Sequence, residues 1–284
     1  MSKPVRTKSS TQRLLRWIGN GLLVVMLIWT LVPFYWMVAT SLKKDKEIYG
    51  FEATLVPRHP TLDAYRLLFV KTPFVKYVRN STIIAVATTA ASLVFGCLGA
   101  YALARLRFPG RKAIARGLVF TYLVPPSLLF IPLFAVMSTF RLIDTYHGLV
   151  LAYLGFTVPF CTWLLMGYFR SVPLELEEAA LVDGCSRMGT LVRIILPMSL
   201  PALAVVAFFS FTQAWNEFLY AQVFVSSNEV RTVTSGISLF IVEDVFFWGP
   251  MMGAAVLSVL PPVILYLVFQ RWVVKGLTLG AVKG

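Results

Sequence analysis

Charge is scarce in this sequence, and negative charge most of all. Asp and Glu number 13 among 284 residues, and charged residues make up 14% of the chain, against about 25% in a typical soluble domain. A soluble fold with so little charge would expose large apolar patches, and a disordered chain would be far less hydrophobic. Both classes are therefore excluded, and the 58% of hydrophobic residues indicates a membrane protein.

Residues that catalyse reactions or bind metals are also rare. The cysteines are Cys97, Cys161 and Cys185, and the two histidines, His59 and His147, lack the spacing of metal ligands. We expect the cysteines to be packing residues, because two lie in apolar runs and one in an inner loop. The sequence has no Gly-x-x-x-x-Gly-Lys phosphate loop. We therefore expect no catalytic residue, no metal site and no cofactor in this chain.

Long apolar runs, by contrast, are plentiful. Six stretches of at least 23 residues contain no Asp, Glu, Lys or Arg, and the next longest such stretches have 11 residues. A helix needs roughly 20 apolar residues to cross a bilayer, and these runs lack the period of two that barrel strands show. The sequence therefore predicts an all-α membrane protein with six transmembrane helices. The predicted spans are about 17–39, 81–104, 117–138, 148–169, 201–224 and 248–270, within a permease domain of residues 17–272.

The distribution of basic residues predicts which side of the membrane each loop occupies. With the N-terminus inside, the inner segments hold 16 Lys and Arg and the outer segments hold 10. Because basic residues accumulate in cytoplasmic loops, we expect an N-in/C-in topology with a cytoplasmic leader (1–16) and tail (273–284). The net charge of +13 therefore does not indicate a nucleic-acid partner. The first apolar run exceeds the length of a signal-peptide core, so a retained helix is favoured over a cleaved signal.

Small residues recur at every fourth position of the second span. They are Thr88, Ser92, Gly96, Ala100 and Ala104. Such a ridge lets another helix backbone approach closely. We interpret the ridge as packing within the bundle, with a subunit interface as the alternative.

The fifth span combines polar residues with an otherwise apolar helix. Gln213, Asn216, Glu217 and Tyr220 recur at i, i+3, i+4 and i+7, which places them on one face of a continuous helix. Polar groups are costly toward lipid, so this stripe is expected to face the interior of the bundle or an aqueous cavity. Two interpretations stay open: the stripe lines the transport pathway or a gate, or it forms hydrogen bonds that fix the bundle.

The polar inner loop between spans four and five, residues 171–197, predicts two short helices. Ser171 is a candidate cap, Pro173 suits a first turn, and Gly184 offers the left-handed conformation that ends a helix. Ser186 then caps a second helix, which Pro197 ends. Its expected apolar face consists of Met188, Leu191, Val192 and Ile195. We expect this face to dock into a protein groove rather than to lie on the membrane surface, because the first helix is acidic.

The same loop carries the residues of a known motif. It contains a Glu-Ala-Ala triplet, an Asp-Gly pair and a final Ile-x-Leu-Pro, with the spacing of the complete EAA motif. The residues of the motif are Glu178, Ala179, Ala180, Asp183, Gly184, Ile194, Leu196 and Pro197. In this motif the chain resembles the permeases of binding-protein-dependent ATP-binding-cassette (ABC) importers. Asn80-Ser81, the segments 101–111 and 214–218, and the tail 276–284 are similar to the carbohydrate-importing, MalG-like branch.

This resemblance implies a fold, partners and residue roles. The fold would be that of a type I importer permease in the bacterial inner membrane. A second permease, a dimer of ATPase subunits that binds ATP and Mg, and an extracytoplasmic solute-binding protein would complete a sugar importer. Glu178 would pair with a basic residue of the ATPase, although simple stabilisation of its helix end is also compatible with its position. The tail, with Gly276, Gly280 and Lys283, would contact the ATPase, and the outer loop 225–247 would approach the binding protein.

Three other functions are less favoured by the sequence. An importer of the same kind for a non-sugar solute, such as a glycerol-phosphate diester, is the first alternative. A stand-alone secondary transporter would need ion-coupling carboxylates near the middle of the membrane, and the six runs contain none. An intramembrane enzyme would need a nucleophile or a metal set, which the sequence does not show.

Overall fold

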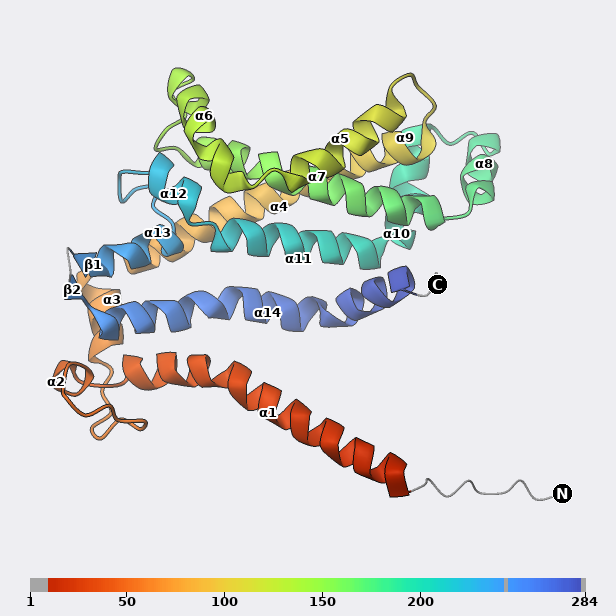
Figure 1. Ribbon diagram of the computed structural model, residues 1–284. Helices are drawn as coiled ribbons and strands as arrows, with labels where there is room; N and C mark the ends of the chain where they lie inside the picture. The colour runs from red at the N-terminus through yellow and green to blue at the C-terminus, as the bar shows by residue number, and fades with distance from the viewer. Residues whose placement is uncertain (1–9, 243–244, 282–284) are drawn as a thin grey trace. The chain divides into compact units, whose positions relative to one another are not determined.

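The structure is a computed structural model that describes residues 10–242 and 245–281, and it is mainly helical, with loops and one short hairpin between the helices (Figure 1). The described chain divides into two compact units. One contains the described residues up to Lys71 together with Phe240–Leu257, and the other contains Thr72–Leu239 and the rest of the chain. The last helix, α14 (Trp248–Ala281), contributes to both.

The first unit is built around the end of α1 (Ser10–Ser41). It also contains α2 (Asp45–Ile48), α3 (Asp63–Lys71), the antiparallel pair β1 (Ile241–Val242) and β2 (Val245–Phe246), and the beginning of α14. Glu47 organises the segment after α2, because its carboxylate accepts hydrogen bonds from the Thr54 hydroxyl (2.6 Å) and the Arg58 amide (3.1 Å). The Thr54 hydrogen bond is the main reason that the pKa of Glu47 is lowered. This half-buried carboxylate is therefore kept ionised as an acceptor.

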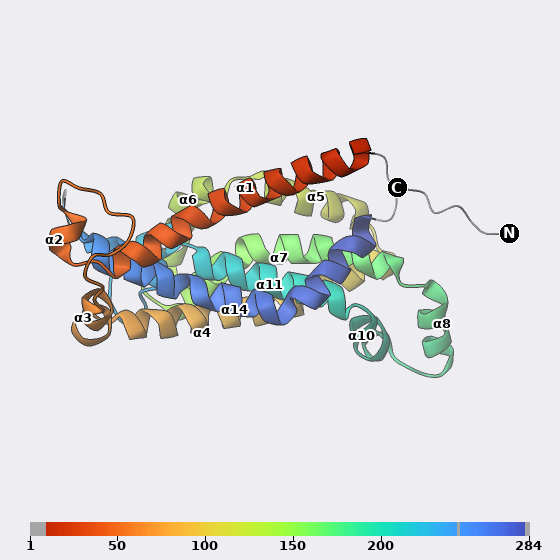
Figure 2. The same ribbon diagram turned by 90° about the horizontal axis from the view of Figure 1, so that it is seen from below.

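Three helices form the centre of the second unit: α4 (Phe74–Arg105), α7 (Tyr146–Ser171) and α11 (Leu200–Asn216) lie side by side (Figures 1 and 2). The small-residue ridge of α4 faces α7. The Ser92 and Thr157 hydroxyls lie 2.7 Å apart, and a Cβ added at Gly96 would come within 3.0 Å of the Cys161 Cβ. The interpretation of the ridge as packing within the chain is therefore confirmed.

The predicted span 117–138 is not one straight helix. It divides into α5 (Arg111–Leu123) and α6 (Pro126–Thr139), and Arg111–Thr121 and Pro126–Thr139 are inclined by 103°. The break falls at Val124 and Pro125, both of which have extended ψ values, 119° and 125°. A residue that precedes proline is driven out of the helical conformation, and the Pro125-Pro126 pair applies this constraint. The predicted span therefore corresponds to a bent pair of helices.

Short helices occupy the two ends of this unit. At one end, residues 171–199 form α8 (Leu174–Val182), α9 (Arg187–Thr190), a π-helical turn (Leu191–Ile195) and α10 (Leu196–Met198). At the opposite end lie α6, α12 (Leu219–Phe224) and α13 (Val233–Ile237), as Figure 1 shows.

Four described helices are long and apolar enough to cross a membrane: α1, α4, α7 and α14. Two bent pairs pass the same test when each pair is counted as one span. They are α5 with α6, and Arg187–Met198 with α11, which are inclined by 84°. The described chain thus offers four to six candidate spans, and each predicted span coincides with at least one helix.

Candidate functional site

The turn of residues 182–186 is built as the sequence predicts. Gly184 has a φ of +85°, the left-handed conformation expected for it. The Cys185 amide donates to the Ala180 carbonyl (2.9 Å) and the Gly184 amide to the Leu181 carbonyl (3.2 Å). These two bonds are those of a Schellman motif, which ends a helix with a left-handed glycine. Ser186 caps the next helix, since its Oγ accepts from the Gly189 amide at 3.1 Å.

The two ends of the loop differ from the prediction. Ser171 does not cap α8; it ends α7 and donates to the Tyr168 carbonyl (2.7 Å), and Pro173 is the residue before the first turn of α8. Pro197 does not end the second helix, because helical structure continues without a break from Arg187 to Met198. The chain bends two residues later, at Ser199, whose ψ of 11° departs from the helical value.

The apolar face expected to dock into a partner is divided. Leu191 and Ile195 belong to the core of this unit, with exposed fractions of 2% and 0%, whereas Met188 and Val192 are exposed. The π-helical turn across Leu191–Ile195 changes the angular spacing of the side chains. Only Met188 and Val192 therefore remain on the surface, and the prediction of one continuous docking face was wrong.

The residues of the EAA motif lie mostly on the outside of this end of the bundle. Ala180 is buried, Ile194 and Leu196 are half-buried, and the others are exposed: Glu178, Ala179, Asp183, Gly184 and Pro197. The neighbouring glutamates of α8 therefore differ, because Glu177 is buried and Glu178 is exposed. A solvated Glu178 can accept a basic partner from another molecule, as charge complementarity at an interface requires.

The predicted polar stripe is not continuous. The helix α11 ends at Asn216, and Glu217 has an extended ψ of 129°. The Glu217 carboxylate accepts from the amides of Tyr220 (2.9 Å) and Ala221 (3.0 Å), so it satisfies two free amides in the first turn of α12. Tyr220 is buried and donates to the Pro126 carbonyl (2.8 Å). The exposed Gln213 and Asn216 are thus separated from Glu217 and Tyr220, which fix the local structure.

Glu217 offers a test of the two interpretations of the stripe. We expect Glu217→Ala to lower the free energy of unfolding by about 1–2 kcal/mol, the usual cost of losing a helix cap. The check is the denaturation of the purified protein in detergent, with the exposed Asn216→Ala as a matched control of unchanged stability. Unchanged stability of Glu217→Ala together with reduced uptake would contradict the structural role and favour the pathway.

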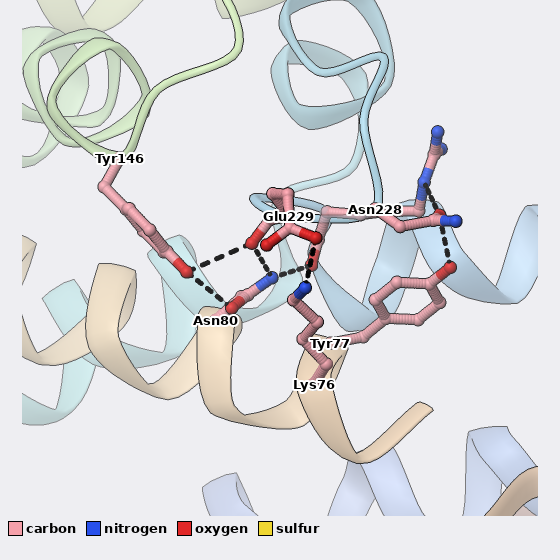
Figure 3. A network of polar contacts seen from close by, with 7 residues as sticks. Lys76, Tyr77, Asn80, Tyr146, Asn228 and Glu229 are labelled. Carbon is pink, nitrogen blue, oxygen red and sulfur yellow. Dashed lines mark hydrogen bonds and ion pairs between the residues drawn. The ribbon is translucent and has the colours of Figure 1, made fainter. Parts of the chain in front are cut away.

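A second polar network lies at the opposite end of the bundle from α8 and fixes the 225–232 loop (Figure 3). Asn80 of α4 is fully buried, and its amide nitrogen donates to the carbonyls of Glu229 and Arg231, both at 2.9 Å. Its Oδ1 accepts from the Tyr146 hydroxyl of α7 at 2.6 Å. One asparagine thus links the loop to the N-terminal parts of two core helices.

Further contacts hold the same loop. The Tyr77 hydroxyl donates to Asn228 Oδ1 (2.6 Å), which also accepts from Arg231 Nε (3.3 Å). The guanidinium of Arg231 then reaches the Ser226 carbonyl at 2.7 Å. Lys76 pairs with the exposed Glu229 at 2.5 Å, an ion pair that contributes little by itself because it faces solvent. The loop is therefore preformed, with its backbone satisfied by buried side chains.

The comparison with known proteins gives the family. Residues 92–279 match the binding-protein-dependent transport system inner membrane component. Over 264 residues the chain is 39% identical to the trehalose/maltose transport system permease protein MalG of Thermococcus litoralis, covering 92% of this chain and 94% of the relative. The chain belongs to this permease family.

Other similarities agree with this family. The permease is 36% identical over 270 residues to the sulfoquinovosyl glycerol transport system permease protein SmoH of Agrobacterium fabrum, covering 95% of this chain and 94% of the relative. The crystal structure of a bacterial ABC transporter that imports the acidic polysaccharide alginate shares the fold. The TM-score is 0.82 at 23% identity, covering 95% of this chain and all of that chain. The permease is thus a helical, multi-pass protein of the inner membrane with the ABC importer permease fold.

Some predicted residues of the permease are only partly described. Gly276 and Gly280 lie in the last turns of α14, and Lys283 lies outside the described residues. The contact of this tail with an ATPase stays a prediction. The reasoning from sequence also missed roles that depend on distant contacts, those of Asn80 and Glu177. For Asn80 the available signals were its place as a polar residue at the start of an apolar run and the similarity of Asn80-Ser81 to the carbohydrate-importing branch.

Proposed function

We propose that this permease is one of two transmembrane subunits of an ATP-driven sugar importer, and that it couples to a separate ATPase through residues 171–197. The observation that supports this most is the exposed Gly184 turn at one end of the bundle, with Glu178 and Asp183 on its surface. The permease would cross the membrane six times, with each bent pair forming one span and both termini in the cytoplasm. The α8 end of the bundle then faces the cytoplasm and the 225–232 loop faces outward.

The coupling step requires no covalent chemistry in this chain. ATP and Mg would bind to the partner ATPase, whose closure moves α8 together with the transmembrane helices attached to it. Glu178 would pair with a basic side chain of the ATPase, and the exposed Met188 and Val192 would add an apolar contact. Nucleotide binding then selects one of two arrangements of the permease pair, which opens the pathway to alternate sides.

The outer face supports a role for a solute-binding protein. The 225–232 loop presents the exposed Ser226, Asn228 and Glu229 on a backbone that is already fixed. A preformed loop loses little conformational entropy when a partner docks. We infer that the binding protein contacts this loop and the residues that follow it to 247, and that the exposed Gln213 and Asn216 line the pathway.

Sugar is the solute class that the relatives favour, since one of them is named for trehalose and maltose. Another relative is named for sulfoquinovosyl glycerol, so the solutes carried within the family differ in chemistry. An importer of a non-sugar solute, such as a glycerol-phosphate diester, is the alternative. A stand-alone secondary transporter is less favoured, because Glu217 is occupied with two backbone amides instead of standing free to bind an ion.

Co-purification tests this proposal. We expect an affinity-tagged permease, solubilised in mild detergent, to retain an ATPase subunit, and Glu178→Arg to reduce the retained amount at least about tenfold through charge repulsion. The matched control is Glu175→Gln, which alters another exposed acid of α8 and should retain the ATPase as the wild type does. A permease that never retains an ATPase, or a Glu178→Arg variant that retains it fully, would contradict the assignment.

A further inference from the structure

Three buried side chains join the coupling segment to the transmembrane helices. Tyr101 and Arg105 lie one turn apart near the end of α4, and Glu177 comes from α8. The Tyr101 hydroxyl donates to Glu177 Oε1 at 2.7 Å. Arg105 Nε lies 3.1 Å from Glu177 Oε2, and both charged side chains are only 8% exposed. This contact is an ion pair without the alignment of a hydrogen bond, so Coulomb attraction holds the two groups together.

The other side of the Arg105 guanidinium contacts the end of α7. Its Nη2 donates to the carbonyls of Phe169 (2.8 Å) and Val172 (2.6 Å). These acceptors lie in the last turn of a helix and just beyond it, where carbonyl groups lack intrahelical partners. One planar guanidinium, carried by α4, thus contacts both α8 and the end of α7. A lysine cannot replace it, because an ammonium group lacks the fixed fork of donors.

The helix α8 has few other attachments. Among its residues only Glu177 and Ala180 are buried, whereas Leu174, Leu176, Leu181 and Val182 are exposed. Apolar packing therefore does little to fix the orientation of this helix. A buried ion pair adds little net stability compared with apolar packing, but it does specify geometry. The position of α8 relative to α4 and α7 depends mainly on Glu177.

We propose that Tyr101 and Arg105 are positioning residues that hold α8, through Glu177, in a fixed orientation on α4 and α7. This inference rests on the proposed coupling function and adds the connection on the transmembrane side of the coupling helix. It also assigns a role to the Tyr101–Arg105 segment, which has no role in the proposed contact between α8 and the ATPase. When the ATPase moves α8, α4 and α7 move with it only if the contacts of Glu177 with Tyr101 and Arg105 stay intact.

The test uses the complete transporter reconstituted in lipid vesicles with its ATPase, second permease and binding protein. Glu177→Gln keeps the side-chain volume but removes the charge that faces Arg105. We expect it to lower the ratio of solute imported to ATP hydrolysed at least about fivefold, the size of a moderate coupling between sites. Glu175→Gln, the same chemical change at an exposed position of α8, is the matched control and should leave this ratio unchanged.

A distance measurement separates positioning from a general loss of stability. Spin labels are placed at Val182→Cys on α8 and at Phe95→Cys on α4, both exposed positions, with Cys185→Ser to remove the half-exposed cysteine. With Glu177 unchanged, we expect one narrow distribution of the distance between the two labels. In the Glu177→Gln variant we expect a clearly broader distribution, with the complex still assembled. Arg105→Lys should reproduce both effects although the charge is kept, because the fork of donors is lost.

Two results would overturn the inference. One is a Glu177→Gln transporter with a narrow distribution and the wild-type ratio of solute to ATP. The other is an Arg105→Lys variant that behaves as the wild type, since the ion pair alone would then suffice. If Glu177→Gln fails to assemble, Tyr101→Phe takes its place, because it removes a single hydrogen bond and should broaden the distribution to a smaller degree. Failure of the proposed function would appear separately, as a wild-type permease that does not retain an ATPase.

Discussion

Replacing Gly184 with valine is expected to reduce solute uptake at least about tenfold while the permease still inserts into the membrane. Gly184 has a φ of +85°, and among the described residues no atom beyond its own chain neighbours lies within 4 Å of a Cβ placed there. The effect therefore comes from backbone conformation and not from a clash. An L-residue pays roughly 1–2 kcal/mol in the left-handed region, and every 1.4 kcal/mol corresponds to a factor of about ten in population. The measurement is solute uptake by cells that contain equal amounts of the membrane-inserted permease.

Asparagine at the same position provides the control. It adopts the left-handed conformation more readily than other residues that carry a side chain, so Gly184→Asn should keep most of the uptake. The Schellman bonds from Gly184 to Leu181 and from Cys185 to Ala180 would remain in place. Normal uptake by Gly184→Val would show that the turn does not need this conformation, and the assignment of the coupling turn would then fail.

Replacing Asn80 with leucine is expected to release the 225–232 loop. The substitution keeps the branched shape of the side chain but removes the buried donor of the Glu229 and Arg231 carbonyls, of which the first is also within 3.2 Å of the Tyr146 hydroxyl. An unsatisfied buried carbonyl costs about 1–3 kcal/mol. Arg231 is only 9% exposed in the folded loop, so local opening should make it accessible to trypsin. We expect cleavage after Arg231 to become at least about tenfold faster, measured by limited digestion of the purified permease.

The matched control for this experiment is two residues further along the same helix. Thr82 is exposed and donates within α4, to the Val78 carbonyl at 2.8 Å, so Thr82→Val should leave the cleavage rate unchanged. Cleavage of Asn80→Leu at the wild-type rate would mean that Tyr77 and Arg231 hold the loop without Asn80. If the binding protein docks on this loop, Asn80→Leu should also lose stimulation of the ATPase by the binding protein.

The structure agrees with the sequence most closely where the signal is local. The Gly184 turn and the Ser186 cap depend on a few neighbouring residues, and both have the predicted form. The breaks at Val124 and Glu217 differ in origin. The first follows from the Pro125-Pro126 pair, a local feature of the sequence that can bend a helix, and the second depends on a carboxylate that turns back to cap α12 instead of extending α11.

The amino-acid sequence alone determined the class of the protein, the approximate positions of the candidate membrane helices and the presence of the EAA motif. Apolar length and motif spacing are properties of the chain itself, and bilayer thickness converts them directly into helices. Only the tertiary structure decided which of two adjacent glutamates is buried, because Glu177 meets Arg105 from a helix about 70 residues earlier. It likewise decided that Asn80 holds a loop about 150 residues away. A buried polar group needs a hydrogen-bond partner, and the fold brings that partner from a distant part of the chain. No local sequence pattern therefore shows which residue it is.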